Sequence, residues 1–222
     1  KGNLCIAASH SQDQWQTSGD FAELPLSLFE QFSAELEQIK GQLKGQFALA
    51  GDNHNVITGN GKIQLENASV QLNQSELNQK QAIVLKNTFI EYQLDKTHTT
   101  ATLNLEPQID GVSAINAHVE TASIDVLMAD ASQAALTGEV RTNIESLAAL
   151  QLTHPAIEGL KGKFKLNIDL GGTIAQPEIL GKAQLEQGEV SIIDAGILLK
   201  NIQAEINGNL NKVDLTLTAD SG

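Results

Sequence analysis

Apolar and polar residues alternate along most of this chain. The alternation is clearest at residues 160–172, where Phe164, Leu166, Ile168 and Leu170 share one parity, and lysine, asparagine and aspartate occupy the other. A period of two places successive side chains on opposite faces of a β-strand, so one face leaves water while the other stays solvated. The pattern predicts a strand, and it leaves open what the apolar face meets.

The same alternation predicts ten further strands, which are separated by turn residues such as Gly51, Asp52, Gly196 and Gly208. They cover residues 43–50, 61–65, 69–72, 88–94, 100–105, 113–119, 181–185, 189–193, 201–206 and 213–219. The predicted fold class is therefore all-β.

Two segments have helical rather than strand periodicity. Residues 24–41 place Leu28, Phe32 and Leu36 four residues apart, with Pro25 suited to a first turn and Gly41 to a C-terminal cap. Residues 143–152 form a weaker candidate, because the proline at position 155 disfavours helix in the residue before it. We expect one or two short helices.

The chain contains an internal repeat. Residues 43–47 (LKGQF) match residues 160–164 (LKGKF), residues 61–66 (GKIQLE) match 181–186 (GKAQLE), and residues 85–87 (LKN) match 199–201 in the same order. Repeated units of this kind stack into one continuous structure. We predict one β unit over residues 1–222, built from repeats at about 24–140 and 141–222, the second being incomplete.

The net charge and the absence of catalytic motifs exclude several classes of function. With 14 basic and 27 acidic side chains the net charge is −13, which argues against nucleic acid or an anionic membrane surface as the main partner. The five histidines lack metal-ligand spacing and Cys5 is the single cysteine. Neither a nucleophile elbow, a metalloprotease helix nor a phosphate-binding loop is present. We expect no enzyme activity, no metal and no cofactor.

The predicted apolar face is larger than the helices can cover. Ten strands present roughly 1,200 Å² of apolar face, whereas one short helix covers about 200 Å². The sheet must curl on itself, pack against a neighbour or hold something apolar. From the pattern alone a filled β-sandwich or barrel is favoured, although an aromatic content of 4% counts slightly against it.

Ordered glycines and leucines between residues 172 and 202 resemble the C-terminal region of the TamB family. TamB proteins are inner-membrane-anchored, periplasm-spanning partners of the outer-membrane protein TamA. The residues that carry the resemblance are Gly172, Pro177, Gly181, Leu185, Gly188, Gly196, Leu199 and Ile202. Leu4, Cys5, Trp15 and the LPL sequence at residues 24–26 are similar to a preceding TamB segment, in which related chains often carry a second cysteine.

The resemblance implies an elongated, curved sheet folded into a taco-like half-pipe with an apolar concave groove, similar to AsmA-like and bridge-like lipid-transfer proteins. Parity selects the residues that would line this groove, and the resemblance implies their contact with lipid. They are Leu43, Phe47, Leu49, Ile63, Leu65, Ile90, Tyr92, Leu103, Leu105, Ile115, Phe164, Leu166, Ile168, Leu185, Val190, Ile192, Ile202, Ile206, Leu215 and Leu217.

Three functional hypotheses remain. The first is a periplasmic segment of a bridge-like protein, with its anchor outside these residues, that carries phospholipids between the inner and outer membranes and binds their acyl chains. The second is a scaffold for outer-membrane β-barrel or autotransporter assembly, which pairs by β-augmentation and works with a TamA-like protein that binds elsewhere on the chain. The third is a plain adhesin-like sandwich, which predicts neither lipid nor an open groove.

Overall fold

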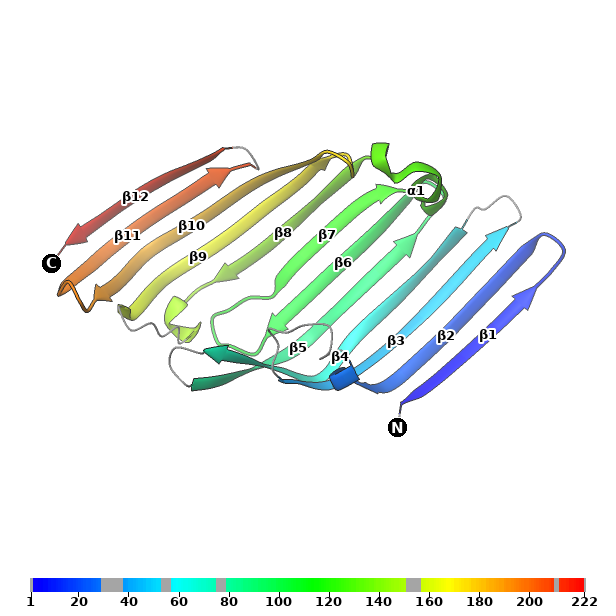
Figure 1. Ribbon diagram of the computed structural model, residues 1–222, viewed down its shortest axis with the longest axis horizontal. Coiled ribbons are helices and arrows are strands. Elements are labelled where there is room, and N and C mark those ends of the chain that lie inside the picture. The colour runs from blue at the N-terminus through cyan, green and yellow to red at the C-terminus, as the bar shows by residue number, and fades with distance from the viewer. Residues whose placement is uncertain are drawn as a thin grey trace.

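The computed structural model describes residues 2–28, 38–52, 57–74, 79–150, 157–209 and 212–221. These residues form a twelve-stranded antiparallel sheet in which each strand pairs with the next one along the chain (Figure 1). The strands are β1 (Asn3–His10), β2 (Gln14–Pro25), β3 (Gln38–Asp52), β4 (Ile57–Gln74), β5 (Gln79–Leu94), β6 (His98–Pro107), β7 (Ile115–Ala122), β8 (Leu136–Ile144), β9 (Ile157–Gly172), β10 (Pro177–Ile192), β11 (Ile197–Gly208) and β12 (Val213–Ser221).

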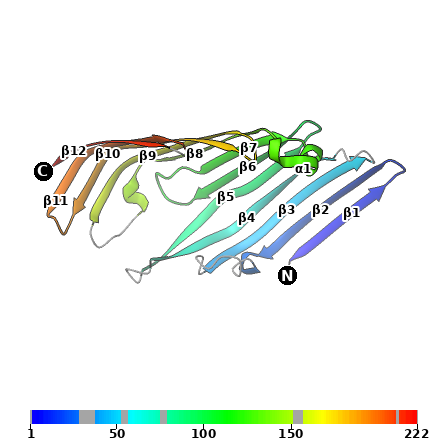
Figure 2. The ribbon, with the colours of Figure 1, turned by 45° about the horizontal axis from the view of Figure 1, so that its top comes forward.

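The sheet is open and consists of one layer. Strands β1 and β12 lie at opposite edges and do not pair with each other, and Figure 2 shows the strands as a single twisted layer. The all-β class predicted from the alternation is confirmed, and so is the curved, unclosed sheet that the family resemblance implies. The filled sandwich or barrel that the pattern alone favoured is wrong, because the described strands form one sheet that does not close.

The described residues bury very little apolar side chain. Their buried hydrophobic residues are Leu26, Ala68, Ala134 and Ile202, and none of the larger side chains among them is fully buried. A globular domain of this size normally buries most of its aliphatic side chains in one core. The apolar face of this sheet therefore has no second layer over it in the described part of the chain.

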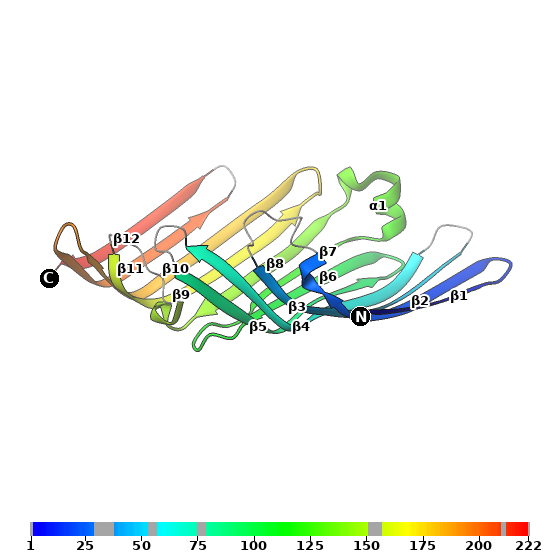
Figure 3. The ribbon, with the colours of Figure 1, turned by 60° about the horizontal axis from the view of Figure 1, so that its bottom comes forward.

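Residues with positive φ interrupt the strands along the end of the sheet drawn at the bottom of Figure 1. Glu23, Asn67, Gln187 and Asn201 have φ between 49° and 57°, and the pairing register shifts beside each of them. An extra residue in one strand bends that strand and increases its twist. In Figure 3 the lower ends of β4 and β5 turn out of the plane of the other strands.

The two predicted repeats carry related irregularities. Asn67 and the buried Ala68 in β4 correspond to Gln187 and the buried Gly188 in β10, and both bulged residues have positive φ. In the next strand of each repeat, Thr88 and Ile202 are the matching buried positions. The boundaries of the repeats stay a prediction.

Both predicted helices are wrong in extent where the structure describes them, because only residues 26–28 of the first and Leu147–Leu150 of the second are helical, each as a short 3-10 segment. Leu24 and Pro25 belong to β2, Gly41 belongs to β3, and residues 29–37 lie outside the described residues. Of residues 143–152, the first two belong to β8, a 3-10 helix covers Leu147–Leu150, and the last two are outside the described residues. Pairing of Leu24 with Leu43 stabilises a strand where local periodicity favours a helix.

One short helix was not predicted. Helix α1 (Ile124–Asp130), followed by the 3-10 helix η2 (Ala131–Gln133), connects β7 to β8 at the upper strand ends in Figure 1. Backbone hydrogen bonds from Ile174 to Ala134 and from Ala175 to Ser132 join this connection to the β9–β10 turn. None of the helices in the described ranges is long and apolar enough to cross a membrane.

Candidate functional site: an apolar face across the sheet

A row of apolar residues crosses all twelve strands without a polar side chain. Each member is the direct pairing partner of the next, so their side chains share one face of the sheet. At about 4.8 Å per strand the row is roughly 50 Å long. It consists of Leu4, Phe21, Gly45, Ile63, Ile90, Leu103, Ala117, Val140, Ile168, Gly181, Gly208 and Val213.

A second apolar row runs beside the first and is displaced from it by two residues in each strand that it crosses. It crosses β1 to β10 through direct pairing partners, and the hydroxyl of Tyr92 is its only polar side-chain group. Its members are Ile6, Gly19, Phe47, Gly61, Tyr92, Ala101, Val119, Gly138, Leu170 and Ile179. We call these two lines the apolar rows, and the surface that contains them the apolar face.

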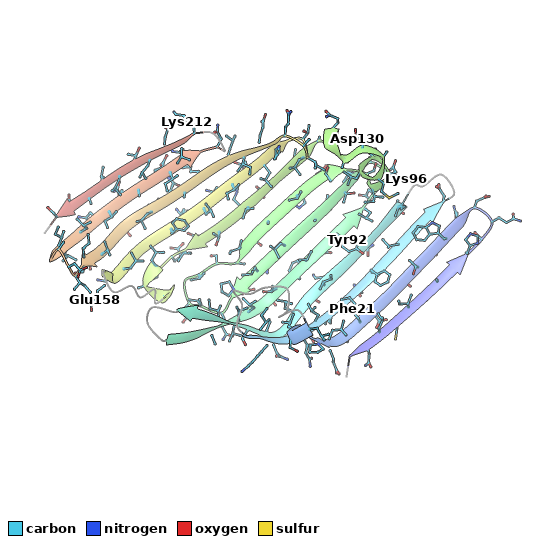
Figure 4. All side chains as sticks on the ribbon, in the orientation of Figure 1. Phe21, Tyr92, Lys96, Asp130, Glu158 and Lys212 are labelled. Carbon is cyan, nitrogen blue, oxygen red and sulfur yellow. The ribbon has the colours of Figure 1, made fainter. Side chains whose placement is uncertain are left out.

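Glycines in these rows make room for aromatic rings on neighbouring strands. A Cβ atom at Gly61 would stand 2.5 Å from ring atoms of Tyr92, and one at Gly45 would stand 2.5 Å from the ring of Phe21. The rings therefore occupy the space that side chains at these glycines would fill. Phe21 and Tyr92 lie on the side of the sheet turned toward the viewer in Figure 4.

The pairing register places every residue of the predicted lining set on the apolar face. In β10 and β11, for example, Leu185 lies opposite Ala204, and Val190 lies opposite Leu199 beyond the bulges. Their exposure differs: Ile90 is 49% exposed and Ile206 is 42% exposed, whereas Ile202 is buried. That these residues contact lipid stays a prediction.

Sequence reasoning did not predict the whole of this face. The apolar face also includes Leu4, Ile6, Phe21, Val119 and Val140, which lie in β1, β2, β7 and β8. In β1 the alternation is hidden because Cys5 and Ala7 on the other face are also apolar. In β2 and β3 the glycines that pair with aromatic residues could have indicated which face is apolar, and the prediction did not use them.

The opposite face is polar and carries cross-strand ion pairs. Nζ of Lys161 lies 2.6 Å from a carboxylate oxygen of Glu189, and Nζ of Lys182 lies 3.4 Å from Glu205. Further pairs join Lys44 to Glu66, Lys62 to Glu91, and Arg141 to Glu139 and Asp169. Their side chains are substantially exposed, so each pair contributes little to stability. The lysines at 161, 163 and 165 belong to this solvated face, as predicted.

Hydrogen bonds lower the pKa of several carboxyl groups on the polar face. The hydrogen bond and charge of Lys161 lower the pKa of Glu189. The amide of Asn207, followed by Gln184 and Lys182, lowers the pKa of Glu205. These groups are ionised at neutral pH and keep this face hydrated.

Two overlapping hollows of about 330 and 450 Å³ lie mainly on the polar side of β1 to β4. Both are lined by Ala7, Ser18, Ala48 and Asn60. Small side chains on adjacent strands account for them. Within the described ranges no three His, Cys, Asp or Glu residues are grouped so as to hold a metal ion, and Cys5 is exposed on the polar face.

Comparison with known proteins identified one family. Residues 1–185 match the family model described as TamB, N-terminal domain. The search of curated proteins and the search of solved structures returned no match.

Proposed function

The chain belongs to the TamB family, and on this premise we propose that it carries phospholipids between the inner and outer membranes along its apolar face. The matched model is that of the N-terminal domain. The motif resemblance assigned the chain to the C-terminal region of TamB, and that assignment is wrong. TamB proteins span the periplasm and act with TamA in the translocation and assembly module. We propose the periplasm as the location of these residues.

The continuity of the apolar rows is the observation that supports this proposal most directly. A site for one small molecule needs a local pocket, whereas these rows cross the whole sheet. The lower ends of β4 and β5 turn out of the plane of the sheet (Figure 3). A long apolar surface that is curved and open suits a chain-like ligand that moves along it.

The energetics favour acyl chains as the ligand. Exposing an acyl chain to water costs about 0.8 kcal/mol per CH₂ group. Aliphatic side chains such as Ile63, Ile90 and Leu103 offer contacts of similar strength at each step. Because the apolar rows contain no charged side chain and only one hydroxyl, that of Tyr92, no single position would hold the chain tightly. Transport of this kind requires no catalytic residue.

A second function, assembly of outer-membrane proteins, is favoured by the two sheet edges. Strands β1 and β12 have one unpaired edge each, and neither contains a lysine or proline that would block pairing. An extended peptide could add to such an edge by β-augmentation. This function depends on main-chain pairing at the edges, whereas lipid transport depends on the apolar face.

Charged substitutions at exposed positions of the apolar face separate the two functions. Ile90 and Ile206 are 49% and 42% exposed, so arginine can replace either without disrupting a packed core. We expect Ile90→Arg and Ile206→Arg to abolish retention of phospholipid by the purified protein, measured by native mass spectrometry, and to impair outer-membrane lipid homeostasis.

The matched controls place arginine on the polar face of the same strands. Gln93→Arg in β5 and Gln203→Arg in β11 add the same charge at exposed positions, and we expect both to retain phospholipid. Normal lipid retention and homeostasis in folded Ile90→Arg and Ile206→Arg variants would contradict the transport proposal. A defect in β-barrel assembly alone would favour the scaffold function.

A further inference from the structure

We infer that the lipid headgroup lies at the β5–β6 turn, against Lys96 and Thr99, and that the acyl chains extend from there along the strands toward the bulges. This inference rests on the proposed function and adds an orientation of the ligand on the apolar face. The headgroup end is the upper end of these strands in Figure 4, where Lys96 and Asp130 are labelled.

A pair of threonines interrupts the apolar face next to the apolar rows. Thr99 in β6 pairs directly with Thr121 in β7, one step beyond the apolar pair Ala101 and Val119. Valine has the same shape as threonine and would suit this face, because it brings no polar atom. A hydroxyl pair at this position marks the upper limit of the apolar surface in β6 and β7.

The hydroxyl of Thr99 is left without a partner. Its Oγ1 atom is buried and makes no hydrogen bond, whereas Thr121 Oγ1 donates to the carbonyl oxygen of Ala135 at 2.8 Å. A buried hydroxyl without a partner costs free energy, and such a group in a native structure calls for an explanation. An ester or phosphate oxygen of a bound lipid would accept this hydrogen bond.

A cation lies in the adjacent turn. Lys96 is exposed between β5 and β6, in a turn closed by a hydrogen bond from the Asp95 amide to the His98 carbonyl at 2.8 Å. Its side chain borders a hollow of about 160 Å³ whose lining includes Trp15 and, from the polar parity of their strands, Gln14, Gln16, Ala50, Asp52 and Thr58. The lysine ammonium provides a positive charge for a phosphate at the end of the strands where the Thr99 hydroxyl lies.

The opposite ends of β4 to β7 present apolar side chains to the ligand, whereas in β8 the hydroxyl of Thr142 lies on the same face. Beyond the apolar rows, Leu105 pairs with Ile115, and past the bulges Val70 pairs with Ile83. The nine residues from Thr99 to Pro107 at the end of β6 span about 27 Å, which exceeds the roughly 15 Å depth of one bilayer leaflet's hydrocarbon. Acyl chains extending downward from Thr99 therefore meet apolar residues along their whole length.

Two photoreactive lipids test this orientation. One phosphatidylethanolamine carries a diazirine on its headgroup and the other carries it at the end of an acyl chain, and crosslinked peptides are located by mass spectrometry. We expect the headgroup probe to label residues 94–101 and 119–123, and the chain-end probe to label residues 83–85, 103–107 and 115–117.

The outcomes distinguish this inference from the function on which it rests. Headgroup crosslinks at residues 83–85 or 103–107 would overturn the orientation and leave lipid binding intact. An absence of crosslinks with both probes would contradict lipid binding itself, and the inference would fail with it.

Conservative substitutions provide the second measurement. We expect Lys96→Gln combined with Thr99→Val to lower retention of phosphatidylethanolamine several-fold and to leave binding of diphenylhexatriene, which has no headgroup, unchanged. The matched control combines Lys212→Gln, in the exposed β11–β12 turn, with Thr137→Val on the polar face of β8. Equal loss of phospholipid in both double variants would contradict the assignment.

Discussion

Tyr92 in β5 covers Gly61, its direct pairing partner in β4, so that a Cβ atom at position 61 would stand 2.5 Å from the ring. We expect Gly61→Ala to push the ring off the sheet and to lower the free energy of unfolding by about 1–3 kcal/mol, as overpacking does. Urea denaturation followed by circular dichroism measures the change.

Gly181 is the matched control for this substitution. It lies in the neighbouring apolar row, and a Cβ atom there would meet only the Gly208 carbonyl oxygen, at 3.9 Å. We expect Gly181→Ala to change the free energy of unfolding by less than about 0.5 kcal/mol, or to raise it through the unfolded state. Equal destabilisation by both substitutions would contradict the role given to the Tyr92 ring.

The bulge at Gln187 places a non-glycine residue in the left-handed region, with φ of 54°. This conformation costs an L-residue roughly 1–2 kcal/mol, and glycine avoids much of that cost. We expect Gln187→Gly to raise the free energy of unfolding by up to about 1 kcal/mol. Gln46→Gly, at an exposed position in the regular part of β3, should lower it by about 0.5–1 kcal/mol. A loss of stability at both positions would show that the bulge is not strained.

The two faces of β1 should respond differently to lipid. Cys5 is exposed on the polar face, and its neighbour Ile6 is 62% exposed on the apolar face. We expect bound phospholipid to slow maleimide labelling of an Ile6→Cys, Cys5→Ala variant several-fold and to leave labelling of Cys5 in the unmodified chain unchanged. Protection of Cys5 instead would place the lipid on the wrong face.

Acidification should lower the stability of the folded chain by protonating carboxylates on the polar face. Lys161 lowers the pKa of Glu189 below its ordinary value of 4.5, so its ionised form is favoured in the folded state. The resulting stabilisation is fully present above pH 4.5 and is lost as the pH falls through the lowered pKa. Because the pair is exposed, we expect a small fall in melting temperature between pH 5 and pH 3, measured by circular dichroism.

The control for the pH effect is Glu189→Gln, which removes the titrating group. Its melting temperature should fall less than that of the unmodified chain over the same pH range. An identical fall in both proteins would show that other carboxyl groups dominate the pH dependence.

Local pattern assigned the faces of the strands well, because side-chain direction in a strand depends only on parity. Phe164, Leu166 and Ile168 lie on one face in whatever sheet their strand joins. The same rule did not predict β8, because Gly138 and Thr142 stand at positions of the apolar face and interrupt the alternation there. It also failed at residues 24–41, where pairing with β3 holds Leu24 and Pro25 in a strand.

The sequence by itself determined that this protein is a sheet with one apolar and one polar face, and its motifs indicated the TamB family. Only the tertiary structure decided that the strands form one open layer, that the apolar residues join in rows across the strands, and that bulges shift the pairing register near one end of the sheet. Parity is a property of each strand alone. Register, closure and curvature depend on hydrogen bonds between strands, so residues as far apart as Leu4 and Val213 become members of one row only when all twelve strands are paired.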